Sequence, residues 1–148
     1  MADSTIKKVQ DGREFQLLGD RVLIKSSAKE TDGAYSFMHW TAAPGATALP
    51  HAHERYEETF YVLNGELSFL LGEKTAIIAI GDFVRVPAGV RHGYKNLSAD
   101  PVDMLVTFIP GGMEELFYKY RTDERDFDAQ SYLHEAKTIH GTEYELVR

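Results

Sequence analysis

A succession of short, strand-like segments occupies residues 15–110, and no helical pattern interrupts it. The segments are rich in β-branched and aromatic residues, and turn sequences such as Asn64-Gly65 and Gly81-Asp82 separate them. Many short strands without crossover helices are typical of antiparallel sandwiches and barrels. We therefore expect an all-β fold with strands over residues 15–17, 21–25, 34–41, 59–63, 67–71, 75–80, 83–86, 92–96 and 102–109.

The pattern changes after residue 112, where apolar residues recur at helical spacing: Met113, Leu116, Phe117 and Tyr120. This spacing predicts a helix that caps the barrel. A second helix is expected around residues 131–139, and the alternation over 142–147 indicates a last strand. We predict a single domain with three parts: an N-terminal arm (1–14), a barrel (15–110) and a C-terminal helical extension (111–148).

Composition narrows the partners and the chemistry. The formal charge of −7 disfavours nucleic acid and anionic membranes as partners, since both attract clustered Lys and Arg. The 148 residues include no Cys, which excludes disulfides, thiolate ligands and a Cys nucleophile and leaves His and carboxylates as the reactive groups. The polar N-terminus resembles no signal peptide, so we expect a cytoplasmic protein that acts on a small molecule.

Three histidines and one glutamate occur where neighbouring strands would bring them together. His51 and His53 are two residues apart, so they leave the same face of a strand, and an adjacent strand can place Glu58 beside them. His92 belongs to a later hairpin and would approach from the opposite wall. Glu57 and Glu58 compete for the carboxylate role; the six residues between Glu58 and Gly65 favour Glu58, and Glu57, which points the other way on a strand, stays the second candidate. Imidazole and carboxylate together suit a divalent metal ion and leave coordination positions open.

The same residues form two spaced motifs. Glycine, five residues, His-x-His, four residues, glutamate, six residues and glycine is matched by Gly45, His51, His53, Glu58 and Gly65. Glycine, five residues, Pro-x-Gly, two residues, histidine, three residues and asparagine is matched by Gly81, Pro87, Gly89, His92 and Asn96. In both motifs the chain resembles the cupin superfamily. The resemblance implies a double-stranded β-helix, or jelly-roll barrel, which is usually dimeric.

The resemblance also implies one divalent metal ion (Fe, Mn, Ni, Cu or Zn), with four ligands in this sequence: His51, His53, Glu58 and His92. A narrower likeness, to the bacterial single-domain cupins grouped with quercetin 2,3-dioxygenase, covers roughly residues 34–147. It rests on residues 60–65, 110–117 and 135–146. It implies a dioxygenase for a small aromatic or enolisable, flavonol- or polyketide-like substrate. A metal-dependent isomerase or decarboxylase and a small-ligand binding module stay open as alternatives.

Residues that share the parity of the ligands are expected to line the substrate pocket, or else to fill the barrel as plain core. They are Met38, Trp40, Phe60, Val62, Phe69, Asn96 and Phe108. Two residues are expected to act on the substrate: Glu58 as a base, and Tyr94, two residues from His92, through its hydroxyl. Four basic residues near the motifs are expected on the outer face of strands or on turns: Arg55, Arg85, Arg91 and Lys95. We therefore expect a neutral or aromatic substrate.

Overall fold

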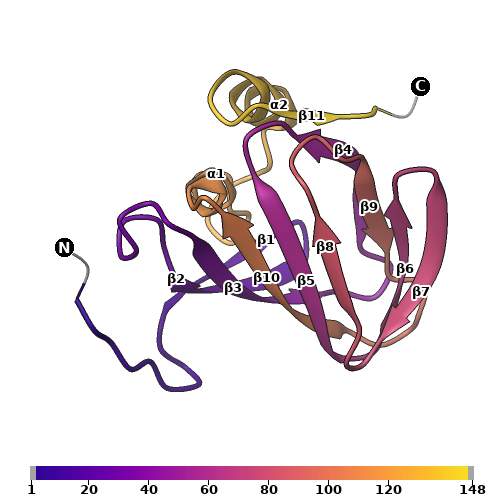
Figure 1. Ribbon diagram of the computed structural model, residues 1–148, viewed down its shortest axis with the longest axis horizontal. Coiled ribbons are helices and arrows are strands. Elements are labelled where there is room, and N and C mark those ends of the chain that lie inside the picture. Colours follow the sequence, from indigo (N-terminus) through magenta and orange to yellow (C-terminus); the bar gives the residue numbers. More distant parts are fainter. Residues whose placement is uncertain (1–2, 147–148) are drawn as a thin grey trace.

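The computed structural model describes residues 3–146 and arranges them as two facing antiparallel sheets with helices at one end (Figure 1). The first sheet has the order β1-β2-β3-β10-β5-β8. Its strands are β1 (Arg13–Leu17), β2 (Asp20–Ser26), β3 (Ser36–Ala42), β10 (Val102–Ile109), β5 (Glu57–Asn64) and β8 (Phe83–Val86). The predicted all-β fold is confirmed.

The second sheet has the order β11-β4-β9-β6-β7. Its strands are β11 (Thr142–Tyr144), β4 (Thr47–His53), β9 (His92–Lys95), β6 (Glu66–Leu71) and β7 (Lys74–Ala79). The first strand begins at Arg13, so the N-terminal arm is shorter than residues 1–14. Of the last predicted strand, only Thr142–Tyr144 is extended and paired, and its expected end at Val147 lies outside the described residues.

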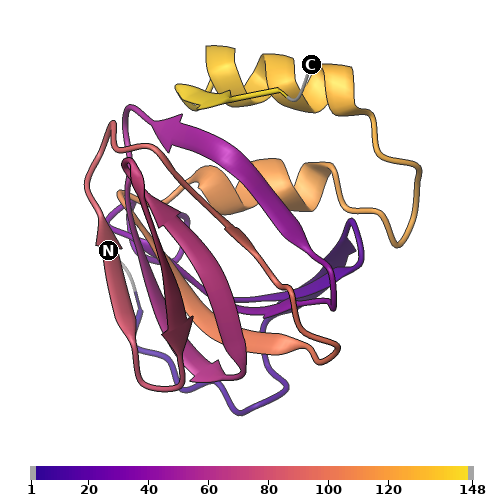
Figure 2. The same cartoon turned by 90° about the vertical axis from the view of Figure 1, so that its right-hand side faces the viewer.

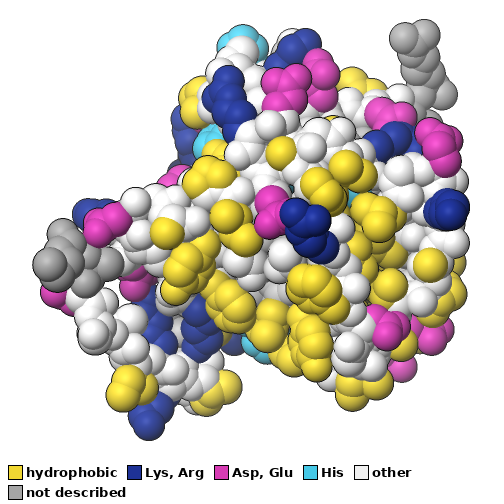
Figure 3. All heavy atoms as spheres, in the orientation of Figure 1, with side chains coloured by type: hydrophobic (Ala, Val, Ile, Leu, Met, Phe, Trp, Pro, Cys, Tyr) yellow, Lys and Arg dark blue, Asp and Glu magenta, His cyan; other side chains and the backbone are white. Residues whose placement is uncertain are grey.

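Alternation along the strands separates the core from the outer surface. On β5, Glu58, Phe60 and Val62 are buried, whereas Tyr61 and Leu63 are exposed. Successive side chains of a strand leave opposite faces, so this alternation aims Glu58 into the barrel. Figure 3 shows hydrophobic side chains gathered on the outer surface over β5 and β8 as well.

Two helices lie together on one side of the sheets, with α2 and β11 next to the end of β4 (Figures 1 and 2). Helix α1 (Met113–Lys119) buries its apolar stripe as predicted, and Phe117 packs edge-on against Trp40 at 5.2 Å between ring centroids. Helix α2 (Ala129–Thr138) begins two residues before its predicted start, because the Asp128 side chain accepts the Ser131 N–H at 3.0 Å. Within residues 3–146, no helix is long and apolar enough to cross a membrane.

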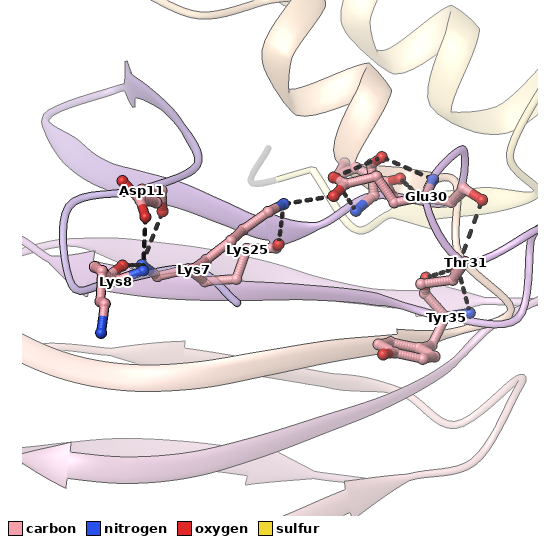
Figure 4. A network of polar contacts seen from close by, with 10 residues as sticks. Lys7, Lys8, Asp11, Lys25, Glu30, Thr31 and Tyr35 are labelled. Carbon is pink, nitrogen blue, oxygen red and sulfur yellow. Dashed lines mark hydrogen bonds and ion pairs between the residues drawn. The ribbon is translucent and has the colours of Figure 1, made fainter. Parts of the chain in front are cut away.

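Residues 3–12 form an arm whose shape is held by lysine side chains. The Lys25 ammonium donates to the carbonyl oxygens of Lys8 (2.6 Å), Val9 (3.0 Å) and Asp11 (2.8 Å). Figure 4 shows Lys7 of the arm reaching back to the Lys25 carbonyl. Despite this anchoring, Val9 is 81 % exposed.

The homodimer expected from the sequence stays a prediction.

Candidate metal centre

The four predicted ligands come from three strands and meet inside the barrel. His51 and His53 lie in the last three residues of β4, Glu58 lies near the start of β5, and His92 begins β9. All four are buried, and one ligand atom from each lies within 4.8 Å of the others. The pairing of His51 with His92 across β4 and β9 explains how ligands distant in sequence become neighbours.

Two glycines allow this close approach. A Cβ at Gly93, next to His92, would lie 2.6 Å from the carbonyl oxygen of Ala48, so only glycine lets β9 come so near to β4. Gly89 has a positive φ of 84° and donates its N–H to the carbonyl of His53 at 2.7 Å. Gly89 belongs to the second motif, whereas the role of Gly93 was missed, although a glycine inside a strand is a known sign of close backbone approach.

The outer nitrogen of each imidazole is engaged by the protein. Nδ1 of His51 is 2.6 Å from the carbonyl oxygen of Leu49, and Nδ1 of His92 is 3.0 Å from that of Val90. A carbonyl oxygen only accepts, so both Nδ1 atoms carry the proton and donate it. Nδ1 of His53 meets Thr142 Oγ1 at 2.7 Å. The protein thus engages Nδ1 of each ring and leaves Nε2, which contacts Glu58 in His53 and His92, as the atom able to bind a metal ion at the centre.

The electrostatics of the centre call for a cation. Nε2 of His53 and Nε2 of His92 lie 3.1 Å and 2.9 Å from Oε1 of Glu58. Burial acts to raise the pKa of Glu58, but hydrogen bonds from these imidazoles lower it to about 2, so the carboxylate stays ionised. Burial and the neighbouring imidazoles lower the pKa of His51 to about 3, which keeps that ring neutral and able to ligate. Three imidazoles around one buried, ionised carboxylate are a donor set that fits a divalent metal ion.

The cluster opens onto a cavity of about 320 Å³ whose wall is mostly apolar. Three of the predicted pocket residues line it: Trp40, Phe60 and Phe108. Further aromatic side chains come from the C-terminal extension, which sequence reasoning did not point to: Phe117, Phe127, Tyr132 and Tyr144. No Lys or Arg within residues 3–146 lines this cavity.

The structure places the other four predicted pocket residues away from the cavity wall. Met38, Val62 and Phe69 are buried in the hydrophobic core, with Phe69 packed edge-on against Phe60 at 5.0 Å. The Asn96 amide instead donates to the backbone carbonyls of Ala43 and Asp100. Strand parity decides which face of the sheet a residue occupies but not its position along the barrel. The prediction therefore also included inward-facing residues that do not reach the cavity wall.

Tyr94 and Asp20 add polar groups to the cavity wall. Among residues 3–146, no group hydrogen-bonds to the Tyr94 hydroxyl. Burial, together with the charges of Asp20 and Glu58, raises the pKa of Tyr94 well above its ordinary value. Tyr94 is therefore a neutral hydroxyl, free to bond a ligand. Asp20 was not predicted; its carboxylate accepts hydrogen bonds from Trp40 Nε1 and the Ala43 N–H, both at 2.9 Å.

The two-sheet fold and its His and Glu cluster define a cupin, and residues 38–108 match the family model described as the cupin domain. The chain therefore belongs to the cupins. Its relatives include quercetin 2,3-dioxygenase of Bacillus subtilis (strain 168), 31 % identical over an alignment of 106 residues that covers 67 % of this chain and 31 % of that protein. Quercetin 2,3-dioxygenase of Aspergillus japonicus is also 31 % identical, over 108 residues and the same shares of the two chains.

Comparison with solved structures agrees on the fold. An RmlC-like cupin from Shewanella frigidimarina NCIMB 400 superposes with a TM-score of 0.65 at 18 % identity, covering 76 % of this chain and 96 % of that one. At this identity the likeness concerns the fold alone. The chain spans about a third of the length of the two quercetin 2,3-dioxygenases that it matches.

Proposed function

We propose that this protein is a metal-dependent dioxygenase for a small, neutral aromatic or enolisable molecule such as a flavonol. The observation that carries the proposal is the buried cluster of three imidazoles and one carboxylate at the wall of an apolar cavity. Its volume of about 320 Å³ lies at the lower end of the range of small-molecule sites. Similarity to two quercetin 2,3-dioxygenases supports the substrate class.

His51, His53, His92 and Glu58 would hold the ion, which can be Fe, Mn, Ni, Cu or Zn, because this donor set accepts several first-row metals. When bound, the ion would supply Lewis acidity toward a substrate oxygen and a route for electrons to dioxygen. Aromatic walls of the cavity would orient a flat ring and exclude water. A cavity to whose wall residues 3–146 contribute no Lys or Arg would bind a phosphorylated molecule poorly.

Two side chains would handle protons at the substrate. Oε1 of Glu58 would accept the proton of an acidic substrate hydroxyl, because its contacts with His53 and His92 place it at the centre of the cluster. The Tyr94 hydroxyl would donate a hydrogen bond to a substrate oxygen. Its raised pKa disfavours the phenolate, so Tyr94 would orient the substrate and not remove its proton.

The test is oxygen uptake by protein loaded separately with each of the five metals, with quercetin as substrate. We expect uptake of dioxygen in step with loss of the flavonol absorbance. Glu58→Gln should abolish it, whereas Glu57→Gln, on the outer face of β5 and paired with Arg85, should not. Absence of uptake with every metal and with other enolisable aromatic compounds would refute the proposal.

A reaction without dioxygen is the second candidate, because the chain matches only about a third of each dioxygenase relative. The same centre would then polarise a substrate oxygen for isomerisation or decarboxylation. Turnover that persists in an anaerobic chamber would favour this alternative. Tight binding of a flavonol without any product would instead indicate a binding module.

A further inference from the structure

The C-terminal strand β11 lies directly against the strand that carries two of the candidate ligands. In the antiparallel pairing of β11 with β4, Thr142 is opposite His53 and Tyr144 is opposite His51. Opposed residues in a sheet project from the same face, so both tail residues stand beside an imidazole of the cluster. Figure 1 shows β11 beside β4, and Figure 2 shows it with α2 over one end of the barrel.

Thr142 contacts the outer nitrogen of His53. Its hydroxyl is 2.7 Å from Nδ1, the side chain is buried, and the same oxygen lies 3.7 Å from the sulfur of Met113. The sulfur is a weak acceptor, so the hydroxyl proton can point to Met113 while the oxygen accepts the proton of Nδ1. This direction favours the tautomer in which Nε2 faces the cluster with a lone pair, the state that a bound metal ion would require in place of the Nε2 hydrogen bond to Glu58.

Tyr144 packs flat against His51. The two rings are 4.7 Å apart between centroids, with an angle of 24° between their planes. The Tyr144 hydroxyl is 2.7 Å from that of Tyr132 on α2, and both tyrosines line the cavity. The tyrosine ring is thus fixed at its far end and restricts the plane that the imidazole can adopt.

We propose that β11 is a positioning element of the metal centre: Thr142 sets the tautomer and orientation of His53, and Tyr144 sets the ring plane of His51. The inference rests on the proposed function only in requiring that the cluster binds a divalent ion. Partners that orient an imidazole ligand from behind commonly contribute tenfold to hundredfold to metal affinity. Here the partners come from a tail strand about ninety residues after the ligands, a separation visible in the pairing of Thr142 with His53.

The decisive comparison is Thr142→Val against Thr142→Ser. Valine keeps the shape but removes the acceptor, so His53 would either leave a buried N–H unpaired or move its proton to Nε2, where it competes with the metal. We expect the dissociation constant for Co(II), measured by competition with a chromophoric chelator, to rise about 10–100-fold in Thr142→Val. Thr142→Ser keeps the oxygen and should stay within about threefold of the wild type.

Tyr144→Leu and Tyr144→Phe test the second contact. Loading the variants with Cu(II) and recording the electron paramagnetic resonance spectrum reports the ligand geometry independently of any turnover. We expect altered copper hyperfine splitting in Tyr144→Leu, which lacks the ring, and a smaller change in Tyr144→Phe, which keeps the ring and loses only the hydroxyl contact with Tyr132. Identical spectra in all three proteins would overturn the role of Tyr144.

The outcomes separate this inference from the proposed reaction, because neither measurement uses substrate or dioxygen. If Thr142→Val lowers the metal-free melting temperature but binds Co(II) as the wild type does, Thr142 is merely structural and its positioning role is refuted. If the variant loses affinity while the wild type oxidises no substrate, the positioning role stands and the dioxygenase proposal falls. A wild-type protein that binds no divalent ion would refute both.

Discussion

Glu58→Gln should lower the stability of the metal-free protein far more than Glu57→Gln. Hydrogen bonds from His53 and His92 overcome the effect of burial and lower the pKa of Glu58 from 4.5 to about 2. At about 1.4 kcal/mol per pKa unit, that shift corresponds to about 3 kcal/mol in favour of the folded protein with an ionised Glu58. Glutamine keeps the shape and loses the charge. Glu57, whose carboxylate pairs with Arg85 on the outer face, is the matched control.

The stability difference between wild type and Glu58→Gln should become smaller at low pH and again at high pH. Because the folded-state pKa of Glu58 is lowered, its contribution is complete above its ordinary value near 4.5 and is lost as pH falls toward 2. For His92, burial opposes protonation, but the carboxylate of Glu58 raises its pKa above the ordinary 6.5. That contribution is complete below 6.5 and is lost as pH rises through the folded-state value. The difference between wild type and Glu58→Gln should therefore be largest between about pH 4.5 and 6.5.

Urea unfolding in the presence of EDTA measures this difference, with the fluorescence of Trp40, the only tryptophan, as the signal. At about pH 5.5 we expect Glu58→Gln to lose about 3 kcal/mol of the free energy of unfolding and Glu57→Gln less than about 1 kcal/mol. The loss in Glu58→Gln should shrink at about pH 3. Equal stabilities of the two variants at about pH 5.5, or a difference that persists unchanged at about pH 3, would refute the reasoning.

Three further predictions concern the backbone, the pocket and the arm. Gly93→Ala should lower the free energy of unfolding in urea by about 1–3 kcal/mol and weaken Co(II) binding, because the new Cβ would lie 2.6 Å from the Ala48 carbonyl oxygen. Wild-type values for both measurements would contradict this close approach of β9 to β4. Tyr94→Phe should change stability by less than about 0.5 kcal/mol yet lower kcat/KM about tenfold, and an unchanged kcat/KM would show that its hydroxyl does not bond the substrate. Replacing Ile6 and Val9, 86 % and 81 % exposed, by aspartate should convert the expected dimer to a monomer in light scattering, and an equal mass for variant and wild type would refute this role of the arm.

Much of the fold and the four candidate ligands could be predicted from local patterns. Strand parity aims Glu58 inward and Glu57 outward, and the two-residue separation of His51 and His53 places both on one face. The helical spacing after residue 112 likewise predicted α1. These features depend on how side-chain directions repeat along a strand or a helix, which is a local property of the chain.

The shape of the site depended on contacts between distant segments. Parity could not tell that Phe60 reaches the cavity whereas Val62 lies in the core, because depth depends on what the opposite sheet supplies. Nor could the alternating tail reveal that β11 pairs with β4 and brings Thr142 to His53. By itself the sequence determined which side chains could serve as ligands, since backbone geometry fixes the face that each one occupies. Tertiary structure alone decided what stands behind those ligands and encloses the cavity, since strand pairing and helix packing join residues that carry no local signal of each other.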